Sequence, residues 1–166
     1  MTARAEPGTP EAGEARDRHP AGPEWRADAL ARSRHSRLDE EIRQPAGDDD
    51  PQRAEELCAD LCRNLLGDFA PALLLLRRDD RRRAQALAAY AHTLFDFARQ
   101  HGVEGEKLAQ INRWEFTLEL ALSGQAVGQP IFVAMARQHG RRPWPQEALD
   151  EISAAARRRV TRPRPA

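Results

Sequence analysis

The spacing of apolar residues between positions 51 and 160 restricts the fold more than any other feature. Large apolar side chains recur there every three or four residues, which is the period of a helix with one buried face. β-branched residues are few, no run alternates apolar and polar residues, and no Asn-Gly hairpin turn occurs. The sequence therefore predicts an all-α fold.

Glycine and proline residues divide this region into helices. Asp50 is suited to cap a helix that begins at Pro51, and Gly67 is suited to end it. Gly102 and Gly124 are expected to end the next two helices. The predicted helices run over 51–66, about 80–101, 104–123, from Pro130 to about residue 140, and onward from Pro145. The buried side of the helix over 80–101 is expected to consist of Ala84, Leu87, Ala88, Ala91, Phe95 and Ala98.

The two ends of the chain have a different composition. Residues 1–25 are rich in Pro, Gly, Ala, Glu and Arg and almost lack large apolar side chains, so we expect a disordered extension. Residues 26–50 are polar, with a weakly amphipathic helix predicted over 26–43. The helical domain is expected to span 51–160, followed by a flexible tail over 161–166.

Charge and hydropathy narrow the class of function. The 26 basic residues balance 26 acidic ones, so no overall field favours nucleic acid, and the runs RRDDRRR and ARRR are interpreted as solvated helix surface. Cys58 and Cys62 lie one helical turn apart with no neighbouring His, which favours small core residues over a zinc site. The N-terminus lacks the apolar core of a signal peptide, and no apolar run could span a bilayer. We expect a cytoplasmic protein without a transmembrane segment, and a peripheral contact with a membrane stays open.

Four segments, taken in order, resemble a known family. They are DFAPALLLLRRDDRRRAQALAAYA, KLAQINRWEFTLELALSGQ, QPIFVAMARQHG and LDEISAAARRRVTRPRPA. Together they resemble the squalene/phytoene synthase family of head-to-head isoprenyl diphosphate synthases, and the hydroxysqualene synthase branch most closely. The likeness covers roughly residues 57–166 and corresponds to the N-terminal half of the family domain. It implies an isoprenoid-synthase-like helical domain, truncated to about five or six helices.

The resemblance also identifies a degenerate metal site. The family carries an Asp-Asp-x-x-Asp motif after the Tyr-Ala pair, whose carboxylates hold Mg²⁺ ions that bridge to the substrate diphosphate. With one residue deleted, Asp96 corresponds to the first Asp, while Phe97 and Gln100 replace the other two. The Arg that precedes the motif is replaced by Thr93 or Leu94. Asp96 is therefore interpreted as the remnant of a metal ligand, and Mg²⁺ is expected only if another chain completes the site.

Other positions of the resemblance concern the substrate pocket. Phe69 and Tyr90 match aromatic residues that line the pocket in the family, and Phe95 is a third candidate. Arg159 stands where the hydroxysqualene branch tends to have an Asp, and the likeness ends before the second aspartate-rich motif. These departures imply that the chain alone does not catalyse prenyl transfer.

Three functions follow from these observations. The first is a truncated, non-catalytic homologue in isoprenoid metabolism of the hopanoid or carotenoid type, acting as a pseudoenzyme or a partner subunit. The second is half of a split prenyl transferase that condenses farnesyl diphosphate together with a second chain. The third is a small helical module that binds protein or RNA. A metal site made of His92, Asp96 and His101 is disfavoured, because His101 is turned away from the face that the other two share.

The width of the apolar stripes predicts association with another chain. In a half-domain such stripes would stay open to water, and large exposed apolar faces usually mark a contact. The predicted partner is a second copy or a second synthase-like chain, with an isoprenoid diphosphate or a lipid as candidate ligand and no nucleic acid. The residues expected at the contact are Leu61, Leu65, Leu87, Phe95, Ile111, Leu118, Phe132 and Ile152.

Overall fold

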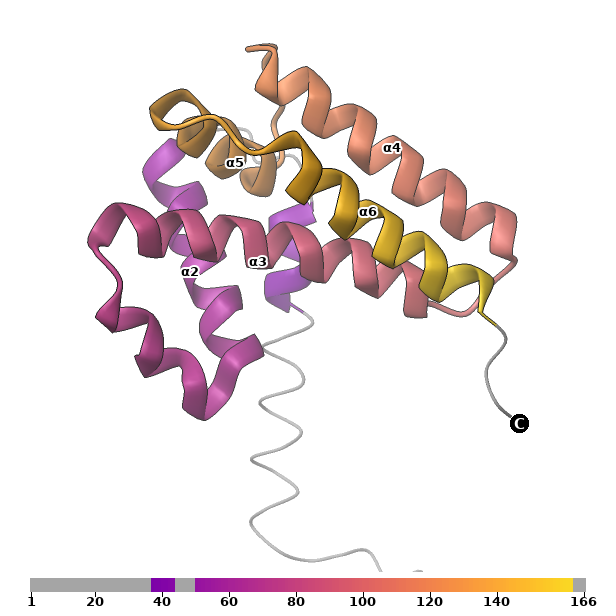
Figure 1. Cartoon of the computed structure of the whole chain (residues 1–166), viewed down its shortest axis with the longest axis horizontal. Helices are drawn as coiled ribbons and strands as arrows, with labels where there is room; N and C mark the ends of the chain where they lie inside the picture. Colours follow the sequence, from indigo (N-terminus) through magenta and orange to yellow (C-terminus); the bar gives the residue numbers. More distant parts are fainter. Residues whose placement is uncertain (1–36, 44–49, 163–166) are drawn as a thin grey trace, which may run out of the picture.

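The computed structural model describes residues 37–43 and 50–162, and helices make up most of these two ranges (Figure 1). No strand occurs in the described ranges, so the predicted all-α class is confirmed. The predicted extension over 1–25 lies outside them, as does most of the polar segment over 26–50. After a short helix over 37–43 come α2 (Pro51–Leu66), the 3-10 helix η1 (Gly67–Leu75), α3 (Arg78–Arg99), α4 (Glu104–Leu122), α5 (Pro130–Arg141) and α6 (Gln146–Thr161).

The helix boundaries follow the local signals closely. The Asp50 carboxylate accepts a hydrogen bond of 2.9 Å from the backbone N–H of Gln52, and α2 ends where Gly67 adopts a φ of 50°. Gly124, just beyond α4, has a φ of 86°. Helix α3 ends two residues earlier than predicted, because the backbone of Gln100 is already extended, with a ψ of 153°.

Helix α3 occupies the middle of the molecule and contacts α2, α4, α5 and α6 (Figure 1). Its expected buried side is therefore largely wrong. Of the six residues predicted there only Ala98 is buried, and the other five are partly exposed. Neighbours on several sides decide which residues are covered, and small side chains let those helices approach closely. The buried residues of α3 are Ala86, Ala89, Tyr90, Thr93, Leu94 and Ala98.

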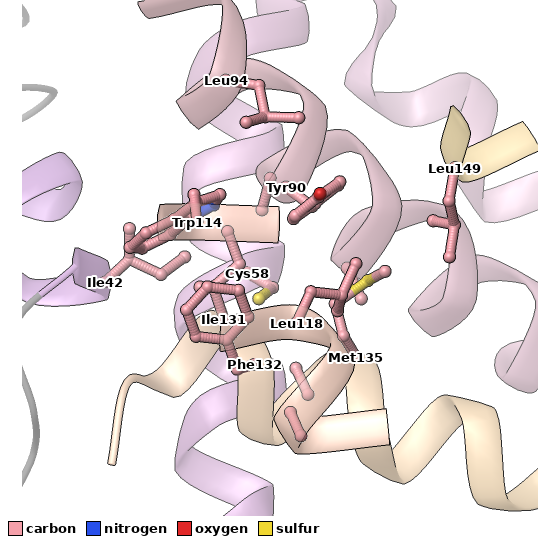
Figure 2. Packing of buried hydrophobic residues seen from close by; sticks show 14 of the residues in the cluster. Ile42, Cys58, Tyr90, Leu94, Trp114, Leu118, Ile131, Phe132, Met135 and Leu149 are labelled. Atoms are coloured by element: carbon pink, nitrogen blue, oxygen red, sulfur yellow. The ribbon is translucent and has the colours of Figure 1, made fainter. Parts of the chain in front are cut away.

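One hydrophobic cluster joins all the helices except η1 (Figure 2). The rings of Trp114 and Phe132 lie 4.4 Å apart between centroids, and Phe97 meets Trp114 edge-on at 5.6 Å. Ile42 of the short helix is completely buried in the same cluster. Cys58 and Cys62 are each 1% exposed, which confirms their prediction as core residues.

The bundle covers the apolar stripes that were expected to bind another chain. Leu61, Ile111, Leu118 and Phe132 are buried in the core. The other four residues named for the contact are partly buried and pack against that core. Among the described residues the exposed large apolar side chains are Phe69, Leu74, Leu75, Leu76, Val103 and Phe116, and the first four belong to η1 or follow it directly.

Candidate functional site

Asp96 lies on α3 where the short helix over 37–43 crosses it. Its carboxylate accepts a hydrogen bond of 2.7 Å from Nη2 of Arg43, and Nε2 of Gln100 approaches the same oxygen at 3.4 Å. Arg99 lies 3.9 Å from the other oxygen. The Asp96 side chain is 30% exposed and that of Arg43 is 21% exposed. The charge of Asp96 is therefore used to hold the short helix on α3.

A second ionisable pair repeats this contact one helical turn away. Nε2 of His92 lies 3.2 Å from Oδ1 of Asp39, so residues four apart on α3 face residues four apart on the short helix. Ile42 lies buried in the core on the same short helix. We call the contacts of Asp39 and Arg43 with α3 the docking seam.

The other positions that the resemblance assigned to the motif and to the preceding Arg also have structural contacts. Phe97 packs its ring against Trp114, and the guanidinium of Arg43 lies 5.3 Å from the centre of the Phe97 ring. Thr93 and Leu94 are fully buried, and the Thr93 hydroxyl donates to the carbonyl of Ala89 at 3.1 Å. A diphosphate-binding arginine at position 93 or 94 would therefore lie inside the core.

The residues around Asp96 do not fit a magnesium site. Two guanidinium groups, those of Arg43 and Arg99, lie within 4.0 Å of its carboxylate and oppose a second cation there. His92 is turned to the docking seam, and His101 is exposed beyond the end of α3. Within ranges 37–43 and 50–162, no three His, Cys, Asp or Glu side chains come together in a way that could hold a metal ion.

The three aromatic residues predicted to line a substrate pocket lie apart. Tyr90 is buried beside Ser153 and borders a cavity of about 500 Å³ between α3, α4 and α6. Burial raises the pKa of the Tyr90 phenol, and its hydrogen bond with Ser153 lowers it by less. Phe95 packs half-buried against the core, whereas Phe69 is 78% exposed on η1. Of the three, only Tyr90 lines this cavity.

Two arginines of the run RRDDRRR are half-buried and make specific contacts with other parts of the fold. Arg82 lies 3.1 Å from the buried carboxylate of Glu55, which also accepts a hydrogen bond of 2.7 Å from Gln138. Arg83 lies over the ring of Trp144 at 3.7 Å and donates to the carbonyl of Pro143 at 2.8 Å. These contacts tie α3 to α2 and to the end of α5.

The two acids of the run are also paired. Asp79 and Asp80 accept hydrogen bonds from Arg141 at 2.9 Å and Arg142 at 3.1 Å, at the end of α5. Arg77, Arg78 and Arg81 form no ion pair with any residue in the described ranges. Arg77 and Arg78 are exposed and Arg81 is half-buried, so the interpretation as solvated surface is only partly right for this run.

A groove of about 650 Å³ opens beside these arginines, between η1 and the adjoining parts of α2 and α3. Part of its lining consists of small and aliphatic side chains, and the remaining side chains carry positive charge or an amide, with no carboxylate among them. Arg63 is paired with Asp60 at 2.8 Å but remains 67% exposed. We call this feature the arginine groove. Its charged side chains are Arg63, Arg78, Arg81 and Arg82, and its apolar lining includes Ala59, Ala70, Pro71, Leu73 and Leu74.

Helix η1 carries a row of apolar side chains on its outer side. Residues three apart eclipse one another in a 3-10 helix, which aligns Phe69, Ala72 and Leu75. Phe69 is 78% exposed and Leu75 is 90% exposed, while Ala70 and Leu73 turn inward. Leu74, 67% exposed, and Leu76, 41% exposed, flank the row. We call Phe69, Leu74, Leu75 and Leu76 the apolar ledge.

The predicted helices over 51–66 and about 80–101 left the residues between them without an element, so the geometry of η1 was not predicted. A run of four leucines has no helical or strand period, so it does not tell which of them are exposed. The one usable signal was the spacing of three between Phe69, Ala72 and Leu75.

Comparison with known proteins adds no assignment, since the chain matches no protein-family model, no curated protein and no solved structure.

Proposed function

We propose that the chain is a non-catalytic squalene/phytoene synthase-like protein of isoprenoid metabolism, a pseudoenzyme or partner subunit rather than a prenyl transferase. One observation carries the proposal. The side chains at the positions of the aspartate-rich motif, Asp96, Phe97 and Gln100, are occupied in joining the short helix and α4 to α3. Chemistry that ionises an allylic diphosphate needs several carboxylates around Mg²⁺, and only one stands here.

A turnover assay tests the proposal directly. The purified chain is incubated with Mg²⁺ and farnesyl diphosphate, and released diphosphate is measured against a buffer blank, with an active prenyl transferase as positive control. We expect release at the background rate, and the same rate for Asp96→Ala. Release above background that disappears in Asp96→Ala would overturn the proposal.

The split-enzyme alternative has its own arm of the assay. A second synthase-like chain that carries an aspartate-rich motif is added to the reaction. If turnover appears only in the mixture and falls with Asp96→Ala, Asp96 is a metal ligand in a shared site and the non-catalytic assignment is wrong. The paired state of Asp96 favours the opposite result, since the Arg43 contact would have to break first.

Association was predicted through stripes that the bundle itself covers. Leu61, Ile111, Leu118 and Phe132 are buried, so a second copy or a second synthase-like chain has less apolar surface to bind than the sequence suggested. Sedimentation velocity at micromolar concentration measures the oligomeric state, and we expect a largely monomeric chain.

For the location of the protein we propose the cytoplasm, at the periphery of a membrane.

An isoprenoid diphosphate or a lipid is the proposed ligand class. The arginine groove supports this choice, because cationic and apolar side chains line the same groove, which suits an anionic head with a hydrocarbon tail. The balanced total charge gives nucleic acid no comparable support.

A further inference from the structure

We propose that the apolar ledge and the arginines beside it form a surface that docks on an anionic lipid bilayer. The ledge would enter the boundary between headgroups and acyl chains, while the arginines contact lipid phosphates. This inference names the surface and the lipid chemistry behind the proposed peripheral location. It does not rest on the synthase relationship, because only the geometry of η1 and its neighbours carries it.

The first step concerns the position of the ledge. Helix η1 forms a corner at one edge of the molecule and packs on α2 and α3 (Figure 1). None of its residues is buried. A protruding corner can reach a planar surface without deformation of the bundle. No described helix is long and apolar enough to cross a bilayer.

Arginines without an ion-pair partner among the described residues lie beside the ledge. Arg77 and Arg78 are exposed directly after the ledge, and Arg81 follows one turn into α3. They lack ion-pair partners among the described residues, while the neighbouring Asp79 and Asp80 are paired with α5. The negative potential of an anionic leaflet attracts basic side chains beside an apolar edge and so stabilises binding. Asp68, exposed at the start of η1, opposes this attraction.

A bilayer suits the ledge and its arginines better than a second copy of the chain does. A two-fold contact places the same patch on both sides, so ledge-to-ledge pairing would bring the two sets of unpaired arginines together. The ledge offers four exposed side chains, whereas a stable protein interface takes about 20–30 residues from each partner. A bilayer needs neither a matching surface nor a large footprint.

Vesicle co-sedimentation with the full chain tests the proposal. Vesicles of phosphatidylglycerol and phosphatidylcholine should bind the chain, and vesicles of phosphatidylcholine alone should bind it weakly. A leucine that leaves water contributes roughly one to two decades of partitioning, so Leu75→Ser and Phe69→Ser should each weaken binding about tenfold. Arg77→Gln should weaken it a few-fold, and Asp68→Asn should strengthen it a few-fold.

Two matched variants serve as controls. Phe116→Ser is the control for Phe69→Ser and replaces a phenylalanine that is 59% exposed on α4. Arg113→Gln is the control for Arg77→Gln and replaces an exposed arginine of the same helix. Both should bind vesicles like the unchanged chain. Because all the substituted residues are surface side chains, circular dichroism should show the same helix content for every variant.

Several outcomes would overturn the proposal. One is the absence of binding to anionic vesicles, and another is an equal loss of binding in the Phe116→Ser control. A third is a dimer that Leu75→Ser dissociates, which would assign the ledge to a second copy. A fourth is displacement from vesicles by soluble short-chain phosphatidylglycerol or by inorganic phosphate, which would assign the groove to a free anion. The turnover assay is unaffected by any of these results.

Discussion

Replacing Asp96 and Arg43 singly and together tests whether Asp96 is a structural residue. Two unit charges about 4 Å apart attract by roughly 4 kcal/mol at an effective dielectric constant near 20. The cost of desolvation and of ordering two side chains offsets most of this, and exposed pairs retain only about 0.2–1 kcal/mol. Since these side chains are 30% and 21% exposed and the bond is 2.7 Å, we expect a coupling of about 1.5 kcal/mol.

The expected pattern is a cycle of three variants. Asp96→Ala should lower the free energy of unfolding by about 2 kcal/mol, because it also removes the contact with Gln100. Arg43→Ala should cost about the same, since its stacking on Phe97 is lost as well. The double variant should lose about 1.5 kcal/mol less than the sum of the two.

Urea unfolding followed by circular dichroism at 222 nm provides the free energies. Amide hydrogen exchange at Ile42 reports separately on detachment of the short helix, which can open before the bundle does. A coupling below about 0.3 kcal/mol would contradict the argument, because that is the usual error of additivity. An Asp96→Ala variant more stable than the unchanged chain would contradict it more strongly, since residues kept for ligand binding often reduce stability.

Two further predictions concern the interior. Glu55→Ala should lower the free energy of unfolding in urea by about 3 kcal/mol, because it leaves Gln138 without its 2.7 Å partner and Arg82 without its carboxylate. Asp60→Ala removes an exposed ion pair on the same helix and should lower it by under about 1 kcal/mol. Equal losses in the two variants would refute the reasoning. Burial raises the pKa of the Cys58 thiol above its ordinary value of 9.0, and the nearby Cys62 and Glu55 raise it further. Above pH 9.0 the folded state therefore keeps a proton that the unfolded state loses. The free energy of unfolding should fall as the pH rises above 9.0. Cys58→Ala should reduce that slope by up to about 1.4 kcal/mol per pH unit, and an unchanged slope would contradict it.

Local chemistry in the sequence determined the helices and most of their ends. Asp50, Pro51 and Gly67 act within a few residues of themselves, so their capping and stopping roles could be predicted without any neighbour. The same holds for the helical period that predicted an all-α fold. Cys58 and Cys62 could be placed in the core because they share a face with Leu61 and Leu65.

Only the tertiary structure decided which of these faces meet and which charges are used. The period of α3 cannot tell how many helices surround it, so its buried side was predicted wrongly. Arg43 lies 53 positions from its partner Asp96 and Gln138 lies 83 positions from its partner Glu55, beyond the reach of any local pattern. The ledge on η1 likewise depends on how a 3-10 turn packs between α2 and α3, because packing rather than composition determines which leucines remain in water.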